Sequence, residues 1–136
     1  MWRYPLDRYQ LGTAFGVVDA AHPNGHRGDD FNGVPAGTAL KAVNDGTIVA
    51  AFYSRVLGNV VVLQVKLWFF GYCHMKTMTP LPIGSKVKAG QVIGQLGNTG
   101  TASTGPHLHL TLSLTKTGVV VGKVFSPYKF LTKVMK

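Results

Sequence analysis

Residues 97–114 read GNTGTASTGPHLHLTLSL, a loop of glycine and small hydroxyl residues that leads directly into a strand-like segment. Alternate residues of a strand point to opposite faces, so a strand over 108–114 places His107 and His109 side by side on one face. Leu108 then points into the core. Two histidines on one face suit metal ligation, or one ligand beside one proton-transfer group. Taken alone, the pattern is weak, and it favours two half-exposed polar residues over a metal site.

The rest of the chain consists of short runs rich in Val, Ile, Leu, Phe and Thr, punctuated by 17 Gly and 7 Pro residues. A short terminal helix is expected over 126–133, where Pro127 stands near the start. The pattern is typical of an all-β fold with little helix: a single antiparallel β-rich domain, either a sandwich or a partly open barrel. Strands are expected over 39–43, 47–52, 59–66, 68–74, 92–96, 108–114 and 119–123.

Composition narrows the chemistry. The chain has 136 residues, which suggests one domain, and its five acidic residues are all aspartate. The absence of Glu excludes an HExxH zinc protease and a Glu–Glu glycosidase pair. Residues 1–45 carry a net charge of −1, whereas residues 46–136 carry ten basic and no acidic side chains. This asymmetry indicates either an anionic partner or a basic solvated surface that aids solubility.

The sequence contains few indications of the cellular compartment in which the protein acts. The single Cys73 cannot form an internal disulfide. The first ten residues, MWRYPLDRYQ, contain no apolar segment of a classical signal peptide. No apolar stretch is long enough for a membrane span.

A second constellation precedes the first strands. In HRGDD, His26 and Asp30 share a side whether the chain is helical or extended through Gly28, and an imidazole with a carboxylate suits zinc. The alternative is a surface loop whose aspartates cap turns. One Asp with two His forms a three-ligand set whose open fourth position is typical of catalytic zinc. The proton acceptor must then be His or Asp, with His74 and the unligated member of the HxH pair as candidates.

The glycine-rich loop brings backbone N–H and C=O groups close to the cleft, where an extended peptide can pair as an added strand. The loop lacks the GxxxxGK[ST] pattern of a phosphate loop and opens a strand rather than a helix.

Four motifs follow one another in a recognisable order: HxGxD at 26–30, Tyr-x-His-Met at 72–75, GNTG at 97–100 and STGPHLH at 103–109. Their order and context resemble those of the lysostaphin-type zinc metallopeptidases, β-rich endopeptidases that cut peptide cross-links of bacterial cell walls. The resemblance covers about residues 12–131. It implies a single catalytic domain over residues 1–136 with a central zinc cleft.

The resemblance also implies roles. His26, Asp30 and His109 are expected to bind one Zn²⁺ per chain, and His74 and His107 are the expected catalytic histidines. One of the two takes a proton from water, while the other contacts the oxyanion or the leaving amine. The residues expected to contact substrate are Tyr72, Asn98, Thr99, Ser103, Thr104 and Gly105.

Some positions depart from the family pattern or have no family role. The hairpin at 64–70 lacks a turn signal, so it is expected to be tight or bulged. Trp68 or Phe69 then either stacks on substrate near the cleft or packs in the core. Asp29 either orients a metal ligand or faces solvent, and His22 is expected in a surface loop.

The expected partner is bacterial peptidoglycan, with anionic wall polymers as a further partner for the basic body, and no nucleic acid. Because no signal peptide is visible, we expect a phage lysin or virion-associated wall hydrolase, delivered by lysis or in the virion.

Two non-enzymatic alternatives remain. Residues 84–93 also resemble the half-motif of biotinyl and lipoyl carrier domains, and Lys76 would be the modified lysine, although its spacing from this element is too short. The other alternative is a peptidase-like domain that has lost its metal and only binds the wall.

Overall fold

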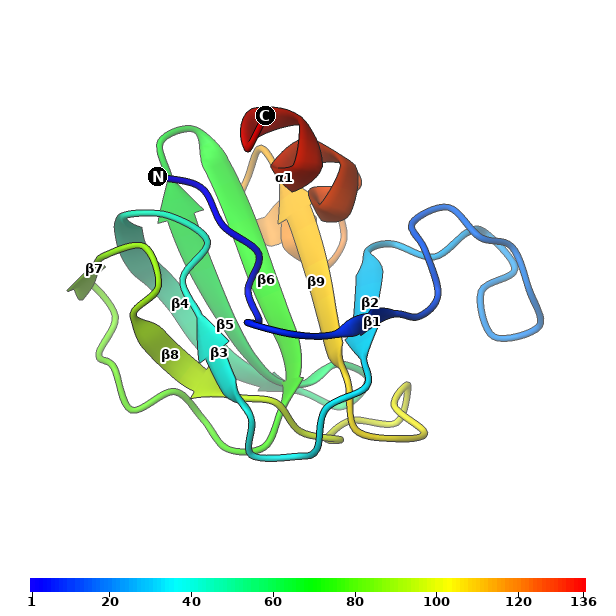
Figure 1. Ribbon diagram of the computed structural model, residues 1–136. Coiled ribbons are helices and arrows are strands. Elements are labelled where there is room, and N and C mark those ends of the chain that lie inside the picture. Colours follow the sequence, from blue (N-terminus) through cyan, green and yellow to red (C-terminus); the bar gives the residue numbers. More distant parts are fainter.

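The computed structural model describes residues 1–136 and has two antiparallel sheets (Figure 1). The large sheet has the strand order β1-β2-β9-β6-β5-β4-β7, and the small sheet pairs β3 with β8. The strands are β1 (Gln10–Leu11), β2 (Asp29–Asn32), β3 (Ala39–Lys41), β4 (Gly46–Ser54), β5 (Gly58–Val65), β6 (Trp68–Met75), β7 (Lys86–Val87), β8 (Val92–Gln95) and β9 (Leu108–Ser113). The predicted all-β fold with little helix is confirmed.

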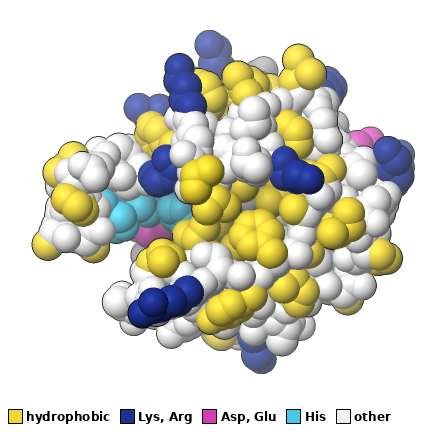
Figure 2. Space-filling model, turned by 180° about the vertical axis from the view of Figure 1, so that it is seen from behind, with side chains coloured by type: hydrophobic (Ala, Val, Ile, Leu, Met, Phe, Trp, Pro, Cys, Tyr) yellow, Lys and Arg dark blue, Asp and Glu magenta, His cyan; other side chains and the backbone are white.

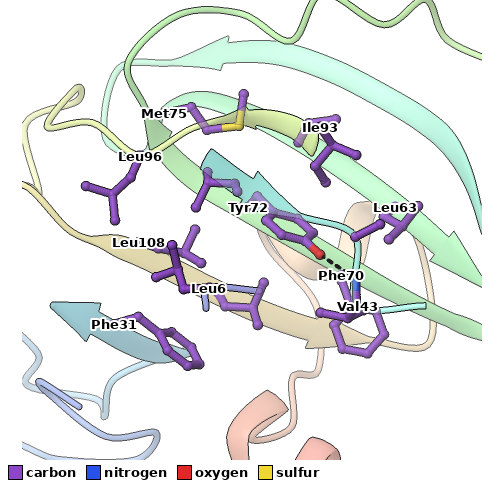
Figure 3. Packing of buried hydrophobic residues seen from close by; sticks show 14 of the residues in the cluster. Leu6, Phe31, Val43, Leu63, Phe70, Tyr72, Met75, Ile93, Leu96 and Leu108 are labelled. Carbon is purple, nitrogen blue, oxygen red and sulfur yellow. Dashed lines mark hydrogen bonds between the residues drawn. The ribbon is translucent and has the colours of Figure 1, made fainter. Parts of the chain in front are cut away.

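The main core lies between one face of the large sheet and the small sheet (Figure 3). Alternate residues of the central strands enter it, such as Phe70 and Tyr72 of β6 and Leu108 of β9. Leu40 of β3 and Ile93 of β8 approach from the small sheet. Burying each such aliphatic or phenyl side chain contributes about 1.5–3 kcal/mol to the stability of the fold, so the packing between the two sheets stabilises this face of the large sheet.

The second face of the large sheet carries a smaller apolar cluster of Val60, Val62, Cys73 and Val119. Val119 belongs to a short 3₁₀ helix, η1 (Thr117–Val119), that packs over this face. The strand predicted over 119–123 is therefore wrong. Gly118 and Gly122 let this segment turn tightly instead, since the amide of Gly122 donates to the carbonyl of Gly118.

The predicted terminal helix is confirmed as α1 (Pro127–Val134). Ser126 is its N-cap, because its hydroxyl accepts a hydrogen bond from the amide of Lys129. No helix is long and apolar enough to cross a membrane.

The β5–β6 hairpin closes through a two-residue turn, with Val65 opposite Trp68, so of the two predicted forms, tight or bulged, the tight one is observed. Trp68 packs against Phe125 and Phe130, with ring centroids 5.8 and 4.7 Å away. Trp68 begins β6 and His74 lies near the end of that strand. Of the two predicted fates for Trp68, core packing is the one observed.

Candidate metal centre

The candidate site lies where three neighbouring strands meet on the second face of the large sheet. Asp30 of β2 is paired with His109 of β9, and His109 is paired with Cys73 of β6. Residues paired directly across strands share one face, so Asp30 and His109 project together away from the main core. Figure 2 shows the histidines and an acidic side chain at the base of a groove beside a projecting lobe. That lobe is the long loop between β1 and β2 (Figure 1).

The lobe delivers His26. The amide of His26 donates to the carbonyl of Val17, and the carbonyl of His26 accepts from the amide of Gly16. These hydrogen bonds fold the lobe back on itself before the chain enters β2. His26 is only 4% exposed as a result.

Three donor atoms converge. Oδ1 of Asp30 lies 3.1 Å from Nδ1 of His109 and 3.4 Å from Nε2 of His26. Ligands bound at about 2.0–2.1 Å to one tetrahedral zinc ion lie about 3.3 Å apart, so this separation fits a shared ion. Two imidazoles and one carboxylate are a donor set that zinc accepts, and the side chains form the one His/Asp group in the chain with metal-binding spacing. The predicted ligand set is thus brought together.

Gly28 explains the glycine of the HxGxD motif. A Cβ placed on Gly28 would lie 2.2 Å from the carbonyl oxygen of Leu110 and 2.9 Å from Cε1 of His109. The chain between His26 and Asp30 therefore passes directly against β9, and only glycine fits there.

The electrostatics favour the ligating protonation states. Burial lowers the pKa of His26, with Asp30 opposing part of the effect. Burial alone would raise the pKa of Asp30, but the hydrogen bond with His109 and the nearby histidine charges lower it overall. Neutral imidazole and ionised carboxylate are the forms that bind a metal ion.

His74 and His107 lie beside this set, with ring centroids 4.7 Å apart. Nδ1 of His74 lies 2.6 Å from the carbonyl oxygen of Thr99, and Nδ1 of His107 lies 2.8 Å from that of Gly105. A carbonyl oxygen can only accept, so each Nδ1 carries a proton, and Nε2 is the nitrogen of each ring that can accept one. Nε2 of His107 lies 3.7 Å from Oδ1 of Asp30, so it faces the ligand set.

Burial lowers the pKa of His74 to about 4, although its hydrogen bond to Thr99 opposes the shift. His74 is therefore neutral at neutral pH. Both histidines present a proton-accepting nitrogen, which is the property that the expected catalytic role requires.

The glycine-rich loop supports these histidines. The hydroxyl of Ser103 donates to Oδ1 of Asn98 and lies 3.2 Å from Nδ1 of His107. Asn98 and Thr104 are exposed. The carbonyl oxygens of Thr99 and Gly105 each accept a hydrogen bond from one of the two histidines, so these two residues orient the histidine rings. Their contacts with substrate remain predictions.

Tyr72 does not line the groove, and its expected substrate contact is wrong. Its side chain is fully buried in the main core. Its hydroxyl donates to the carbonyl of Lys41 and accepts from the amide of Val43, each at 3.1 Å, and Figure 3 shows the second bond. Strand alternation explains the error, because Tyr72 precedes Cys73 and so points away from the face that carries His109.

Asp29 and His22, two further titratable residues near the site, each make defined contacts. Asp29 is buried, and its carboxylate accepts from the amides of Phe15 and Tyr128 and from the hydroxyl of Ser126. It ties the lobe and α1 to β2, which corrects the expectation that it faces solvent or orients a ligand. His22 lies on the lobe, with its ring 4.4 Å from that of His26 and its Nδ1 2.9 Å from Asp19.

Sequence reasoning overlooked Arg27, the variable residue inside the HxGxD motif. Its guanidinium donates to the carbonyl oxygens of Gly118 and Gly122 at 3.1 and 2.9 Å. It therefore joins the loop that carries His26 to η1 and to the turn that follows η1. No local sequence pattern predicts this contact, because its partners are about ninety residues away along the chain.

A β-rich domain that brings together a His/Asp group with metal-binding spacing and two adjacent histidines has the side chains that a metallopeptidase requires. The chain belongs to peptidase family M23, which it matches over residues 24–122. It is 35% identical over 113 residues to the peptidoglycan DD-endopeptidase ShyC of Vibrio cholerae, covering 79% of this chain and 25% of that protein. The murein hydrolase activator NlpD of Salmonella dublin is 32% identical over 132 residues, covering 96% of this chain and 31% of that protein.

Among solved structures, the catalytic domain of lysostaphin from Staphylococcus simulans superimposes with a TM-score of 0.80 at 32% identity, covering 91% of this chain and 92% of that one. This chain spans about a quarter of the length of the first curated relatives that it matches. The comparisons confirm the predicted family, the metallopeptidase class and zinc as the cofactor. The family match replaces the carrier-domain alternative.

Proposed function

We propose that this chain is a zinc endopeptidase that hydrolyses peptide cross-links or stem peptides of bacterial peptidoglycan. The observation that carries the proposal is the placement of His74 and His107, whose Nδ1 atoms are bound to carbonyl oxygens, beside the group formed by His26, Asp30 and His109. The wall-acting peptidases among the relatives support the choice of substrate.

His26, Asp30 and His109 would hold the zinc ion. When bound, the ion polarises the scissile carbonyl and makes a water molecule more acidic. His107 is the better placed of the two histidines to take the water proton, because its Nε2 faces the ligand set at 3.7 Å from Asp30. Its Nδ1–H bond to Gly105 stabilises the resulting imidazolium, which then returns the proton to the leaving nitrogen as the C–N bond breaks.

His74 has a different role in this scheme. Its low pKa keeps Nε2 unprotonated, so it accepts hydrogen bonds and orients the attacking water or a substrate N–H. This assignment separates the two roles that the sequence left open between His74 and His107.

On the glycine-rich loop, we place substrate contacts at the two exposed residues Asn98 and Thr104. An extended peptide can pair with free backbone groups there, as in other edge-binding proteins. Delivery by lysis or in a virion stays a prediction from the sequence.

The first test is clearance of a bacterial wall suspension by the wild-type chain, by the chain after chelation, and by the chelated chain with zinc restored. We expect clearance, loss and recovery, with new amino groups appearing as peptide bonds are cut. Mass spectra of the products then identify the scissile bond, using walls with glycine bridges and walls with direct cross-links. Clearance without new amino groups would contradict a peptidase.

An activator role is the second candidate, because NlpD matches nearly the whole chain. The two roles differ in what the purified protein does alone. An activator leaves walls intact until a second hydrolase is added, whereas a hydrolase releases peptides by itself. The complete ligand set and both histidines favour the hydrolase.

We also propose that anionic wall polymers bind the basic face of α1. Lys129, Lys133 and Lys136 line one surface hollow, and none of them pairs with a carboxylate. Binding to a glycerol phosphate polymer should weaken steeply with salt. It should fall in Lys129→Gln/Lys133→Gln and persist in the charge-matched control Lys86→Gln/Lys88→Gln. Equal loss in both variants would leave only general charge attraction.

A further inference from the structure

The backbone of His74 is held in a conformation that L-residues rarely adopt. Its φ is +61°, in the left-handed region, and Lys66 in the hairpin turn is the only other non-glycine residue with positive φ. A disfavoured conformation inside a strand persists only when its surroundings impose it. The contacts around His74 therefore identify what imposes it.

The conformation coincides with a bulge. Pairing between β5 and β6 shifts register between Asn59 and Val61, so that Asn59 faces Met75 while Val61 faces Tyr72. Strict alternation would point His74 into the main core with Tyr72. The bulge instead leaves His74 in the groove beside His107 while Met75 returns to the core.

Two side chains fasten the strand just after the bulge. The amide nitrogen Nδ2 of Asn59 donates to the carbonyl of Met75 at 3.1 Å, and the hydroxyl of Thr99 donates to the same carbonyl at 2.7 Å. The Thr99 hydroxyl also accepts from the backbone amide of Asn59 at 3.1 Å. The hydroxyl therefore bonds to both strands at the bulge.

Thr99 contacts His74 a second way. Its carbonyl accepts the Nδ1 proton of His74 at 2.6 Å. One residue thus fixes the backbone next to His74 through its hydroxyl and the ring of His74 through its carbonyl. The backbone amide of His74 is bound in turn by the carbonyl of Leu57 at 2.7 Å.

We propose that Asn59 and Thr99 are positioning residues for His74: they hold its left-handed backbone, which keeps its imidazole in the groove beside the ring of His107. The sequence predicted Thr99 as a substrate contact, whereas this inference gives its hydroxyl a different task. The catalytic part of the inference rests on the proposed peptidase function, and its structural part does not.

The test compares Thr99→Val, which removes the hydroxyl at nearly constant size, with Thr99→Ser, which keeps it. Thr101→Val is the matched control, since Thr101 is an exposed threonine of the same loop whose hydroxyl makes no hydrogen bond. Asn59→Asp is the second variant, because it removes the Nδ2 donor at constant shape. Each protein is assayed for zinc content, for kcat and KM on a soluble cross-link peptide, and for the NMR signal of the His74 Nδ1 proton.

We expect Thr99→Val and Asn59→Asp to lower kcat by about 10- to 100-fold, because a displacement of about 1 Å of a reacting group costs this much. KM and zinc content should stay near wild type, and the slowly exchanging Nδ1 proton signal of His74 should be lost. Thr99→Ser and Thr101→Val should resemble wild type.

The inference is overturned if Thr99→Val and Asn59→Asp keep both the Nδ1 signal and wild-type kcat, or if Thr99→Ser falls as far as Thr99→Val. A fall in zinc content parallel to kcat would also overturn it, because that indicates general damage to the site. The NMR arm is repeated on metal-free protein, so it reports on positioning even if the wild type proves inactive and the proposed function fails.

Discussion

Replacing Gly28 with alanine is the most sensitive way to disturb the metal centre without touching a ligand. The added Cβ would lie 2.2 Å from the carbonyl oxygen of Leu110, in β9 next to His109. Ordinary contact needs more than 1 Å of additional separation, and the obstacle is sheet backbone, which cannot rotate away. The loop that carries His26 and Asp30 must therefore move off β9.

The size of the effect follows from that displacement. Overpacking of this kind costs about 1–3 kcal/mol, which lowers the Tm of a chain this long by roughly 3–10 °C. The donor atoms now fit one ion closely, and outer-shell disturbance of such sites weakens metal affinity by about 10- to 100-fold. We therefore expect the substitution to lower the zinc affinity more noticeably than it lowers the Tm.

Chelator competition measures the zinc affinity, and circular dichroism of metal-free protein measures the Tm. Gly105→Ala is the matched control, because a Cβ on this glycine of the same groove would meet nothing within 4 Å. Wild-type zinc affinity in Gly28→Ala would refute the steric account of the HxGxD glycine.

Three further outcomes follow from the site. Burial lowers the pKa values of His26 and His74, so below a pH of about 6.5 the unfolded chain binds more protons than the folded chain. The Tm of metal-free protein should therefore fall between pH 7 and pH 5. An unchanged Tm would contradict the burial of these two rings in their neutral form. Arg27→Ala should lower stability by about 1.5–3 kcal/mol in denaturant titration, because two charge-assisted bonds to Gly118 and Gly122 are lost, and an unchanged midpoint would mean that these bonds contribute nothing. Adding zinc to metal-free protein should raise the Tm in proportion to ligand saturation, whereas magnesium at the same concentration should not.

The residues of the site could be predicted from the sequence better than the distant strands and loops that bring them together. Spacing alone placed His107 and His109 on one side and Leu108 in the core, because strand alternation is a local rule. The convergence of His26 with His109 depends on the lobe and on β2, which pairs with β9 about eighty residues later in the chain. Residue types alone suggested one Asp and two His around an ion, and only the family resemblance assigned His26, Asp30 and His109 as that set; neither predicted the pairing of β2 with β9.

The errors share a cause in long-range structure. Tyr72 lies two residues from His74 and was placed with it in the groove, yet a bulge between them sends the two side chains to different faces of the sheet. The valine-rich run at 119–123 has strand propensity but no strand beside it to pair with, so η1 and its turn form instead, tied to Arg27. In both cases the deciding partner is distant in sequence, and local pattern does not contain it.

The central claim is that His109 binds zinc while its neighbour His107 moves protons. The decisive measurement is zinc content together with peptide release from purified walls for His109→Ala and His107→Ala. We expect His109→Ala to lose both metal and activity, and His107→Ala to keep about one zinc per chain while losing activity by at least about 100-fold. Full activity in either variant, or equal zinc loss in both, would contradict the account.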